Sequence, residues 1–528
     1  MASVNRVFGL ASGLDIDKIV SDLMKAHRLQ VDKLRQDKQI WQWRQEDYRT
    51  INSALLSLRN TVFNLKLQGS FLTKKAISSN TSIVTATATS TSTAGTYQVK
   101  VNSLATVAMN ASTEAIASTD FDPNATLVSQ QDKFSGVDWN TIWDPETHEF
   151  SFTINGQNFT FDGDTATLNS IIAAVNANKA AGVTMFYDSS SRKVVITTTK
   201  TGDNNPGGPE ITFSGSFLTN VLKLDSTKEQ GGTDASFEIN GFAVTSHTNT
   251  YTINGTTFNF VGADPNQIVT VTVEQDIDAV VNVIKNFVDK YNETIELINK
   301  EYYEERYPDY RPLTDTQIEE GKLTDKQIDA WQEKARSGLL KGDAILNWVL
   351  TSLRRVVSGI VEGFTESVTV TTSSGQQVSV VADRLSVIGI TTGSYTEHGK
   401  LYLDENRLRE ALQSNPEAVM QLFTRTRDEN GNEITETSKK GIAVQLYDAL
   451  NSAISRITSQ AGSAGAFYDQ SYIGRLIRDI DQRISAMEEW LANLEDRYYR
   501  QFTALEQAIA RMNVQSMWLA QQFMGTNE

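Results

Sequence analysis

Apolar side chains recur every three or four positions along the first part of the chain, and this spacing predicts helix. One apolar stripe covers residues 16–34 and a second covers 41–65, with a weaker stretch around Asp37. Asp15 or Ser12 can cap the first helix, because both side chains accept hydrogen bonds from the free amides of a helix N-terminus. The pattern is equally consistent with two helices and with one long, bent helix.

The pattern changes near Ser70 to Thr-, Ser- and Val-rich runs with a period of two, which predicts strands to about Val273. The tripeptide Ile-Asn-Gly occurs three times in this part of the chain, at 154–156, 239–241 and 253–255. Asn-Gly between two strand-like runs predicts a two-residue hairpin turn, because both residues tolerate a positive φ. Three tight hairpins are therefore expected.

The first of these turns opens a compact module. The stretch FTINGQNFTF predicts a β-hairpin, and an apolar stripe over 168–175 predicts a helix capped by Thr165 or Thr167. The runs GVTMFYD and KVVITTT then predict a second pair of strands. Hairpin, helix and hairpin follow one another within about 50 residues, a common supersecondary length.

Helical spacing returns at Asp276, and the end of the chain has the most regular pattern. Short strand-like runs, VTVTTSSGQQVSVV and GKLYLDENRL, interrupt the helices before it. A heptad repeat in the last segment predicts a coiled-coil-like helix of about 45 residues, roughly 65–70 Å long. Its expected seam positions are Ile477, Ile480, Ile484, Met487, Leu491, Leu494, Tyr498, Gln501, Leu505, Ala508 and Met512.

The fold class predicted from these patterns is α+β and multidomain, with paired long terminal helices and inserted β-rich head domains. A coiled-coil helix needs a partner for its seam, and the N-terminal helices are the natural partner within the chain. The expected division has terminal leg helices at 1–42 and 491–528, and a mostly helical stalk at 43–75 and 276–490. An inner β-rich head domain is expected at 76–110 and 232–275, and an outer head domain at 111–231.

Composition excludes several classes of function. The net charge of −16 argues against nucleic-acid binding, which needs a basic surface. The absence of cysteine removes disulfides, thiol catalysis and thiolate metal sites. The four histidines lie outside any metal-ligand spacing, and none of the common catalytic or nucleotide-binding motifs occurs. No catalytic residue, cofactor or metal site is predicted, and the chain is not expected to be an enzyme.

The first residues carry the apolar run VFGLASGL at 7–14. A conventional cleaved signal is not predicted, since Asp15 and Asp17 end the run and Arg6 is the only charge before it. No stretch has the roughly 18 uncharged apolar residues that a membrane-spanning helix requires. The run is either a frayed terminus before a helix or an arm that becomes ordered only against a partner.

Taken in order, these segments resemble the flagellar filament cap family, also called flagellar hook-associated protein 2. The resemblance extends over nearly the whole chain, apart from about 110–150. The segments that carry it are GLASGLDIDKIVSDLMKA, AGTYQVKVNSLATVAMNAS, the Ile-Asn module, DIDAVVNVIKNFVDKYNETIELIN, LLKGDAILNWVLTSLRRVV and YYRQFTALEQAIARMNVQSMWLAQQF. The Ile-Asn module and KYNETIELIN favour the cap over another axial protein at the hook-filament junction.

The resemblance implies a structural cap at the distal tip of the bacterial flagellar filament. Such a protein is exported by the flagellar type III system without a cleaved signal and promotes flagellin folding and polymerisation. It also prevents the loss of exported monomers. The implied partners are flagellin, further copies in a ring of about four to six subunits, and a cytoplasmic export chaperone at the C-terminal helices. Nucleic-acid binding and membrane insertion are not implied, whereas some members adhere to host surfaces.

The terminal helices carry the residues expected to contact flagellin or neighbouring subunits. An alternative function from another class is a surface adhesin whose β-rich head binds glycan. Under the cap hypothesis the expected interface residues are Phe8, Leu10, Leu14, Ile16, Ile19, Val20, Leu23, Leu491, Leu494, Leu505 and Met512.

Overall fold

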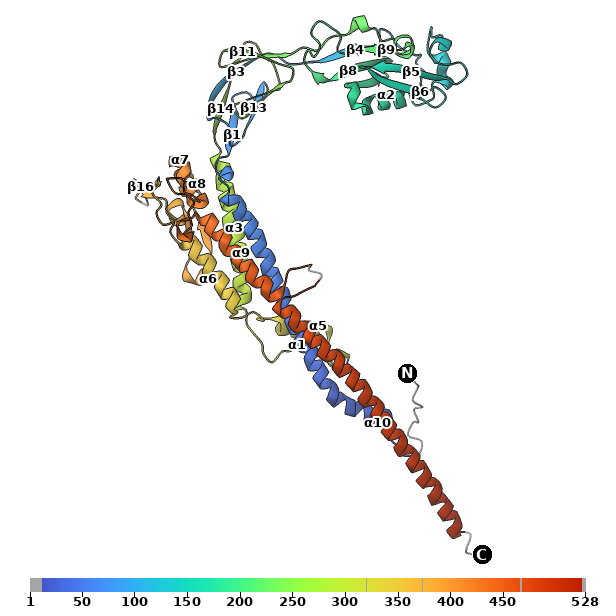
Figure 1. Ribbon diagram of the computed structural model, residues 1–528, viewed down its shortest axis with the longest axis vertical. Coiled ribbons are helices and arrows are strands. Elements are labelled where there is room, and N and C mark those ends of the chain that lie inside the picture. The colour runs from blue at the N-terminus through green and yellow to red at the C-terminus, as the bar shows by residue number, and fades with distance from the viewer. Residues whose placement is uncertain (1–11, 320, 373, 466–467, 525–528) are drawn as a thin grey trace. The chain divides into compact units, whose positions relative to one another are not determined.

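The computed structural model describes residues 12–319, 321–372, 374–465 and 468–524 of the 528-residue chain (Figure 1). The chain forms two compact units. The first, called the helical unit here, contains Met1–Phe71 and Ile277–Glu528, and the second, the β unit, contains Leu72–Asp276. The β unit is therefore an insertion in the helical unit, and the predicted α+β class with long terminal helices is confirmed.

A single helix, α1 (Ile16–Lys66), accounts for both N-terminal apolar stripes. Asp15 caps it, and its side chain accepts a hydrogen bond from the backbone N–H of Lys18 at 3.0 Å. The helix ends where Leu67 adopts an extended conformation. Of the two possibilities that the spacing left open, the continuous helix is the one formed.

Eight further helices build most of the described part of the helical unit. Tyr48 and Tyr291 are among its largest fully buried side chains, and one continuous core joins them. The two ends of the chain thus pack into one folded body. The bounds are α3 (Ile277–Tyr303), α4 (Asp315–Glu319), α5 (Asp325–Arg336), α6 (Ala344–Ser358), α7 (Glu405–Ser414), α8 (Pro416–Thr424), α9 (Ile442–Ala461) and, as an eighth, α10 (Tyr472–Met524).

Two small sheets complete the helical unit. Strands β15 (Ser367–Thr371) and β16 (Gln377–Val381) form a hairpin, and β17 (Ile390–Thr392) pairs with β18 (Leu401–Leu403). Val368 on β15 is buried. Both sheets lie in the strand-like runs that the sequence identified before the last helices.

The β unit has two separate hydrophobic cores, and two sheets enclose the first. Buried Val99, Val271 and Phe237 lie in that core. The five-stranded sheet has the order β1-β14-β3-β10-β11, and the three-stranded sheet has the order β12-β13-β2. The bounds are β1 (Lys74–Ser78), β2 (Val84–Ala88), β3 (Gly95–Ser103), β10 (Ala235–Ile239), β11 (Phe242–Ser246), β12 (Thr250–Ile253), β13 (Thr256–Phe260) and β14 (Val269–Gln275).

The second core of the β unit contains the predicted hairpin-helix-hairpin module. Thr167 caps α2 (Leu168–Ala177) in a capping box with Ser170. The sheets have the orders β4-β8-β7 and β6-β5-β9. The bounds are β4 (Val107–Ala111), β5 (Glu149–Ile154), β6 (Gln157–Asp162), β7 (Val183–Asp188), β8 (Lys193–Thr201) and β9 (Phe213–Ser214).

All three predicted Asn-Gly turns form. Asn155, Asn240 and Asn254 have φ values of 49°, 51° and 49°, and the glycine after each is also at positive φ. Each turn joins two paired antiparallel strands. The finer division of the chain into leg, stalk, inner-head and outer-head parts stays a prediction.

None of the helices in the described part of the chain is long and apolar enough to cross a membrane.

Candidate assembly surface of the terminal helices

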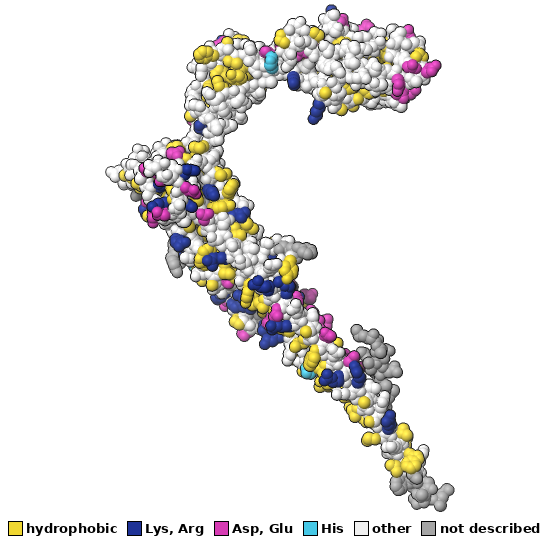
Figure 2. Space-filling model, viewed as in Figure 1, with side chains coloured by type: hydrophobic (Ala, Val, Ile, Leu, Met, Phe, Trp, Pro, Cys, Tyr) yellow, Lys and Arg dark blue, Asp and Glu magenta, His cyan; other side chains and the backbone are white. Residues whose placement is uncertain are grey.

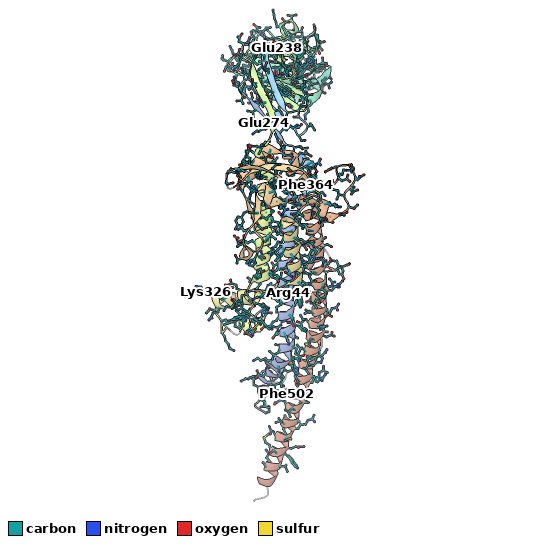
Figure 3. All side chains as sticks on the ribbon, turned by 90° about the vertical axis from the view of Figure 1, so that its left-hand side faces the viewer. Arg44, Glu238, Glu274, Lys326, Phe364 and Phe502 are labelled. Atoms are coloured by element: carbon teal, nitrogen blue, oxygen red, sulfur yellow. The ribbon has the colours of Figure 1, made fainter. Side chains whose placement is uncertain are left out.

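Helices α1 and α10 lie side by side and run in opposite directions (Figure 1). At one end of the pair, Tyr499 Oη donates a hydrogen bond to Asp17 Oδ1 at 3.0 Å. At the other end, Gln45 Nε2 donates to Asp469 Oδ2 at 2.7 Å. The beginning of the chain therefore packs against its end, and Arg44 and Phe502 mark two levels of the pair in Figure 3.

An apolar seam joins the two helices. It combines residues that recur at four-residue and seven-residue intervals on α1 with heptad positions on α10. Burying a Val, Leu, Ile or Met side chain contributes about 1.5–3 kcal/mol, so the seam stabilises the pair substantially. The fully or nearly fully buried seam residues are Ile16, Val20, Met24, Val31, Ile480, Ile484, Leu491 and Leu494.

Ion pairs flank the seam, with the cations on α1 and the acids on α10. The side chains of these pairs are all at least 31% exposed, so each contributes at most about 1 kcal/mol. Their main effect is on register, because only the antiparallel alignment brings each cation to an acid. The pairs are Arg28–Glu495 at 3.6 Å, Arg35–Glu488 at 2.6 Å and Lys38–Asp481 at 2.6 Å.

Asp469 fixes the α9–α10 connection to α1. Its Oδ2 accepts hydrogen bonds from Arg49 at 2.8 Å and from Gln45 at 2.7 Å. Burial acts to raise the pKa of Asp469, but hydrogen bonds from Ser471 and the charge of Arg49 outweigh it and leave that pKa below its ordinary value. The carboxylate form is thus the one that holds the helices together.

The predicted heptad register holds as far as Leu494 and then drifts. Leu505 is 45% exposed and Met512 is 64% exposed, whereas Glu506 is only 3% exposed. A straight helix has 3.6 residues per turn, so a seven-residue repeat rotates by about 20° per heptad away from its partner. At this level Ser12 donates a hydrogen bond from Oγ to the Glu506 carboxylate.

A groove of about 610 Å³ runs beside the seam. Trp490 forms one wall, is 47% exposed, and meets the His27 ring edge-on at a centroid distance of 5.5 Å. Apolar lining in a groove with exposed aromatic surface is suited to contact with another chain. The lining residues are Gln30, Lys33, Leu34, Asp37, Arg483, Ala486, Met487 and Trp490.

Residues 505–519 of α10, called the distal segment here, expose apolar side chains on two faces. Leu505, Met512 and Leu519 recur every seven residues on one face. Val514, Met517 and Trp518 lie on the other side of the helix and are 59–62% exposed. A helix that is apolar on opposite sides is normally buried among several neighbours. Figure 2 shows apolar side chains gathered over this end of α10.

The expected interface residues fall into three groups in the structure. Phe8 and Leu10 lie outside the described residues. The seam within the chain contains Ile16, Val20, Leu491 and Leu494, with Ile19 half-buried beside it. The side chains open to solvent are Leu14, Leu23, Leu505 and Met512, with exposed fractions of 44%, 41%, 45% and 64%.

Sequence reasoning missed part of the exposed surface. Val514, Met517 and Leu519 were not among the expected interface residues, although all three are more than 45% exposed. The signal was the apolar content of NVQSMWLA, which follows Met512, the last seam position that the heptad repeat assigned. A search for apolar residues on both faces of the helix would have found them.

A long helix pair whose apolar end is exposed among the described residues, together with an inserted β unit, defines a structural protein built to assemble with other chains. Two family models match: Flagellar hook-associated protein 2 N-terminus over residues 12–108, and Flagellar hook-associated protein 2 C-terminus over residues 232–514. The chain belongs to the flagellar hook-associated protein 2 family. Its function is that of a filament cap, and its location is the tip of the bacterial flagellum.

The similar proteins include flagellar hook-associated protein 2 of Halalkalibacterium halodurans, which is 32% identical over 98% of this chain and 100% of its own length. The protein of that name from Thermotoga maritima is 24% identical over 99% of this chain and 96% of its own. Among solved structures, the flagellar cap protein FliD D1-D2-D3 domains from Escherichia coli are 20% identical. That match covers 82% of this chain and 99% of the other, with a TM-score of 0.49.

Proposed function

We propose that the paired terminal helices are the legs of the cap and that the distal segment of α10 contacts flagellin. The single observation that supports this is the change along α10 from a seam buried within the chain to apolar side chains exposed on two faces. Residues buried in the seam stabilise the leg, and residues beyond it bind neighbours. Leu505 and Met512 belong to the second group, together with Leu14 and Leu23 on or beside α1.

The same arrangement accounts for the action of a cap on flagellin. An apolar helix end that no described residue of its own chain covers can pack against the apolar helices of a newly exported subunit and hold them until they join the filament. In this proposal the cap is a ring of about four to six copies. A cytoplasmic chaperone covers the C-terminal helices before export, and no catalytic step is involved.

The test replaces two side chains of the distal segment, Met517 and Trp518, by Asp. The Met517→Asp, Trp518→Asp variant should fold normally, because both side chains are about 60% exposed. Cells that carry it should secrete flagellin monomers into the medium and form short filaments or none. Filament length is measured by electron microscopy, and secreted flagellin by immunoblotting.

The matched control is Gln515→Asp, which adds a carboxylate to the same turn at an exposed polar position. It should leave filament length unchanged. Filaments of normal length in the Met517→Asp, Trp518→Asp strain would contradict the assignment of the distal segment to flagellin binding.

A further inference from the structure

The hairpin of β15 and β16 has two edges that differ in how their backbone groups are bonded. The outer edge of β15 is covered, because the N–H of Thr369 donates to Ser414 Oγ at 2.8 Å and the N–H of Thr371 donates to Glu410 Oε2 at 3.0 Å. Both acceptors lie on α7. Side chains of a packed helix thus take the place of a third strand on this side.

The outer edge of β16 has no such cover among the described residues. Thr372 N–H donates to Gln376 O at 2.8 Å, and Ala382 N–H donates to Glu366 O at 2.9 Å. These bonds set the phase of the antiparallel ladder, in which every second residue of β16 bonds to β15. The backbone N–H and C=O groups that point away from β15 therefore belong to the alternate residues of β16, which do not bond to β15.

Those outward residues are Gln377, Ser379 and Val381. All five residues of β16 are exposed, and no described residue forms a hydrogen bond with the backbone of these three. A strand edge of this kind is a template for pairing with another chain. Its free N–H and C=O groups point to where a further strand would lie.

The side chains of β16 extend an apolar surface beyond the core. Val378 and Val380 lie opposite Val370 and Val368 in the ladder, so all four point to the same face. Val368 and Val370 are 1% and 2% exposed, whereas Val380 and Val378 are 36% and 37% exposed. A strand added beside β16 would cover the two exposed valines and continue this face.

The hairpin also lacks the features that proteins use to keep edge strands apart. Residues 367–381 contain no charged residue and no proline. Natural sheets usually place Lys, Pro or a bulge at such an edge to prevent pairing. Their absence from residues 367–381 leaves the outer edge of β16 open to pairing.

The small size of this edge identifies the kind of partner. A stable protein-protein interface needs about 20–30 residues on each side, and β16 offers five. An added strand is recognised mainly through its backbone, so its sequence matters little beyond alternating apolar side chains. A short, unselective contact fits a transient occupant and does not fit a permanent subunit.

We propose that the outer edge of β16 transiently binds an extended, apolar segment of a flagellin chain that has not yet folded. This inference rests on the proposed function, because only a cap that receives unfolded subunits meets such segments. Strand addition shields the segment from aggregation. The segment leaves when its own fold offers a better partner.

The test uses the full chain and changes one outward amide. Ser379→Pro removes the N–H that points away from β15, and proline is tolerated on an edge strand where the N–H faces solvent. Ser379→Ala keeps the N–H and is the matched control. The probe is a fluorescent seven-residue peptide of alternating Thr and Val, compared with the same peptide N-methylated at every second residue.

Fluorescence anisotropy should detect weak binding of the unmodified peptide to the wild-type chain and to Ser379→Ala. Ser379→Pro should weaken binding about five- to tenfold, the effect of losing one hydrogen bond and its alignment. The N-methylated peptide should not bind. Equal binding to Ser379→Pro and Ser379→Ala would overturn the inference.

A second measurement separates another occupant from the proposed one. Sedimentation velocity that shows concentration-dependent dimers of the wild-type chain, lost in Ser379→Pro, would identify a second copy as the occupant and overturn the inference. Cells with Ser379→Pro should form shorter filaments that still carry caps. Normal filaments in the Ser379→Pro strain would refute the proposed role of β16 and would leave the cap function standing. Normal filaments in a strain that lacks the whole protein would refute the cap function.

Discussion

Burial changes the pKa of individual carboxyl groups in the helical unit. Asp47 on α1 and Glu301 on α3 line a cavity of about 620 Å³ with Arg336. Burial raises the pKa of Asp47 although Arg336 Nη2 lies 3.1 Å away, and burial also raises the pKa of Glu301. These groups therefore bind protons more tightly in the folded chain than in the unfolded one.

The raised pKa values make the folding stability of the chain depend on pH. A raised folded pKa gives stability that is complete below the unfolded value and is lost as pH rises through the folded value. The window opens at the ordinary values of 3.8 for Asp47 and 4.5 for Glu301 and extends upward. The Asp47→Asn, Glu301→Gln variant should thus lose less stability than the wild type between about pH 4 and pH 7.

Urea unfolding of the full chain, followed by far-ultraviolet circular dichroism at several pH values, measures this difference. Asp469→Asn is the control with the opposite sign, because its pKa is lowered in the fold and its contribution is lost as pH falls. Parallel pH profiles for wild type and the double variant would contradict the assignment.

Residue-scale features could be predicted from sequence wherever the signal was local. The three Asn-Gly turns and the Asp15 and Thr167 caps depend on residues within a few positions, and all of them formed. The lack of a partner strand at the outer edge of β16, as the described residues show it, could not be predicted. Which edge stays free depends on Ser414 and Glu410, and only the packing of α7 brings those side chains to β15.

At the scale of elements, the α1–α10 seam determines whether the terminal helices pair. Leu494 is 7% exposed in this seam, so Leu494→Asp buries a carboxylate without a partner. The variant should lower the free energy of unfolding of the helix pair by about 3 kcal/mol or more. Thermal unfolding followed by circular dichroism at 222 nm measures the loss.

Ala492→Asp is the matched control for this change, since Ala492 is exposed on the same helix. It should shift the melting temperature little. Similar shifts for the two variants would show that charge on α10, and not loss of the seam, causes the effect.

The heptad repeat of α10 predicts the buried positions over only part of that helix. The heptad repeat identified α10 and most of its buried positions up to Leu494. It did not reveal that the pairing ends near Glu506, because the sequence continues with apolar residues. The rotation of the heptad positions exposes Leu505, and α10 then extends past the beginning of α1 at Ile16. A pattern on one helix carries no information about the length of its partner.

At the scale of the whole molecule, the β unit begins and ends at paired neighbouring strands. Lys74 on β1 lies opposite Gln275 on β14, and Asp276 N–H donates to Thr73 O at 2.9 Å. The two ends of the insertion are therefore adjacent, and both of its cores consist only of its own residues. Removing it should leave the helical unit intact.

We expect a chain in which residues 74–275 are replaced by a short Gly-Ser linker to keep the helical content of the helical unit. The isolated fragment 72–276 should also unfold cooperatively. Circular dichroism and differential scanning calorimetry of both proteins test this. Loss of a cooperative transition in the fragment would contradict its independence, as would loss of helix in the shortened chain.

The seam between α1 and α10 also constrains the order in which the protein can fold. Asp17 and Tyr499, which bond across it, are 482 positions apart in the chain. Contacts between residues so distant in sequence are slow to form, because the chain between them must first be brought to closure. Whichever end of the chain leaves a narrow conduit first, α1 and α10 can meet only after nearly all the rest has emerged. The helix pair therefore forms late in folding, because its formation requires nearly the whole chain to be present.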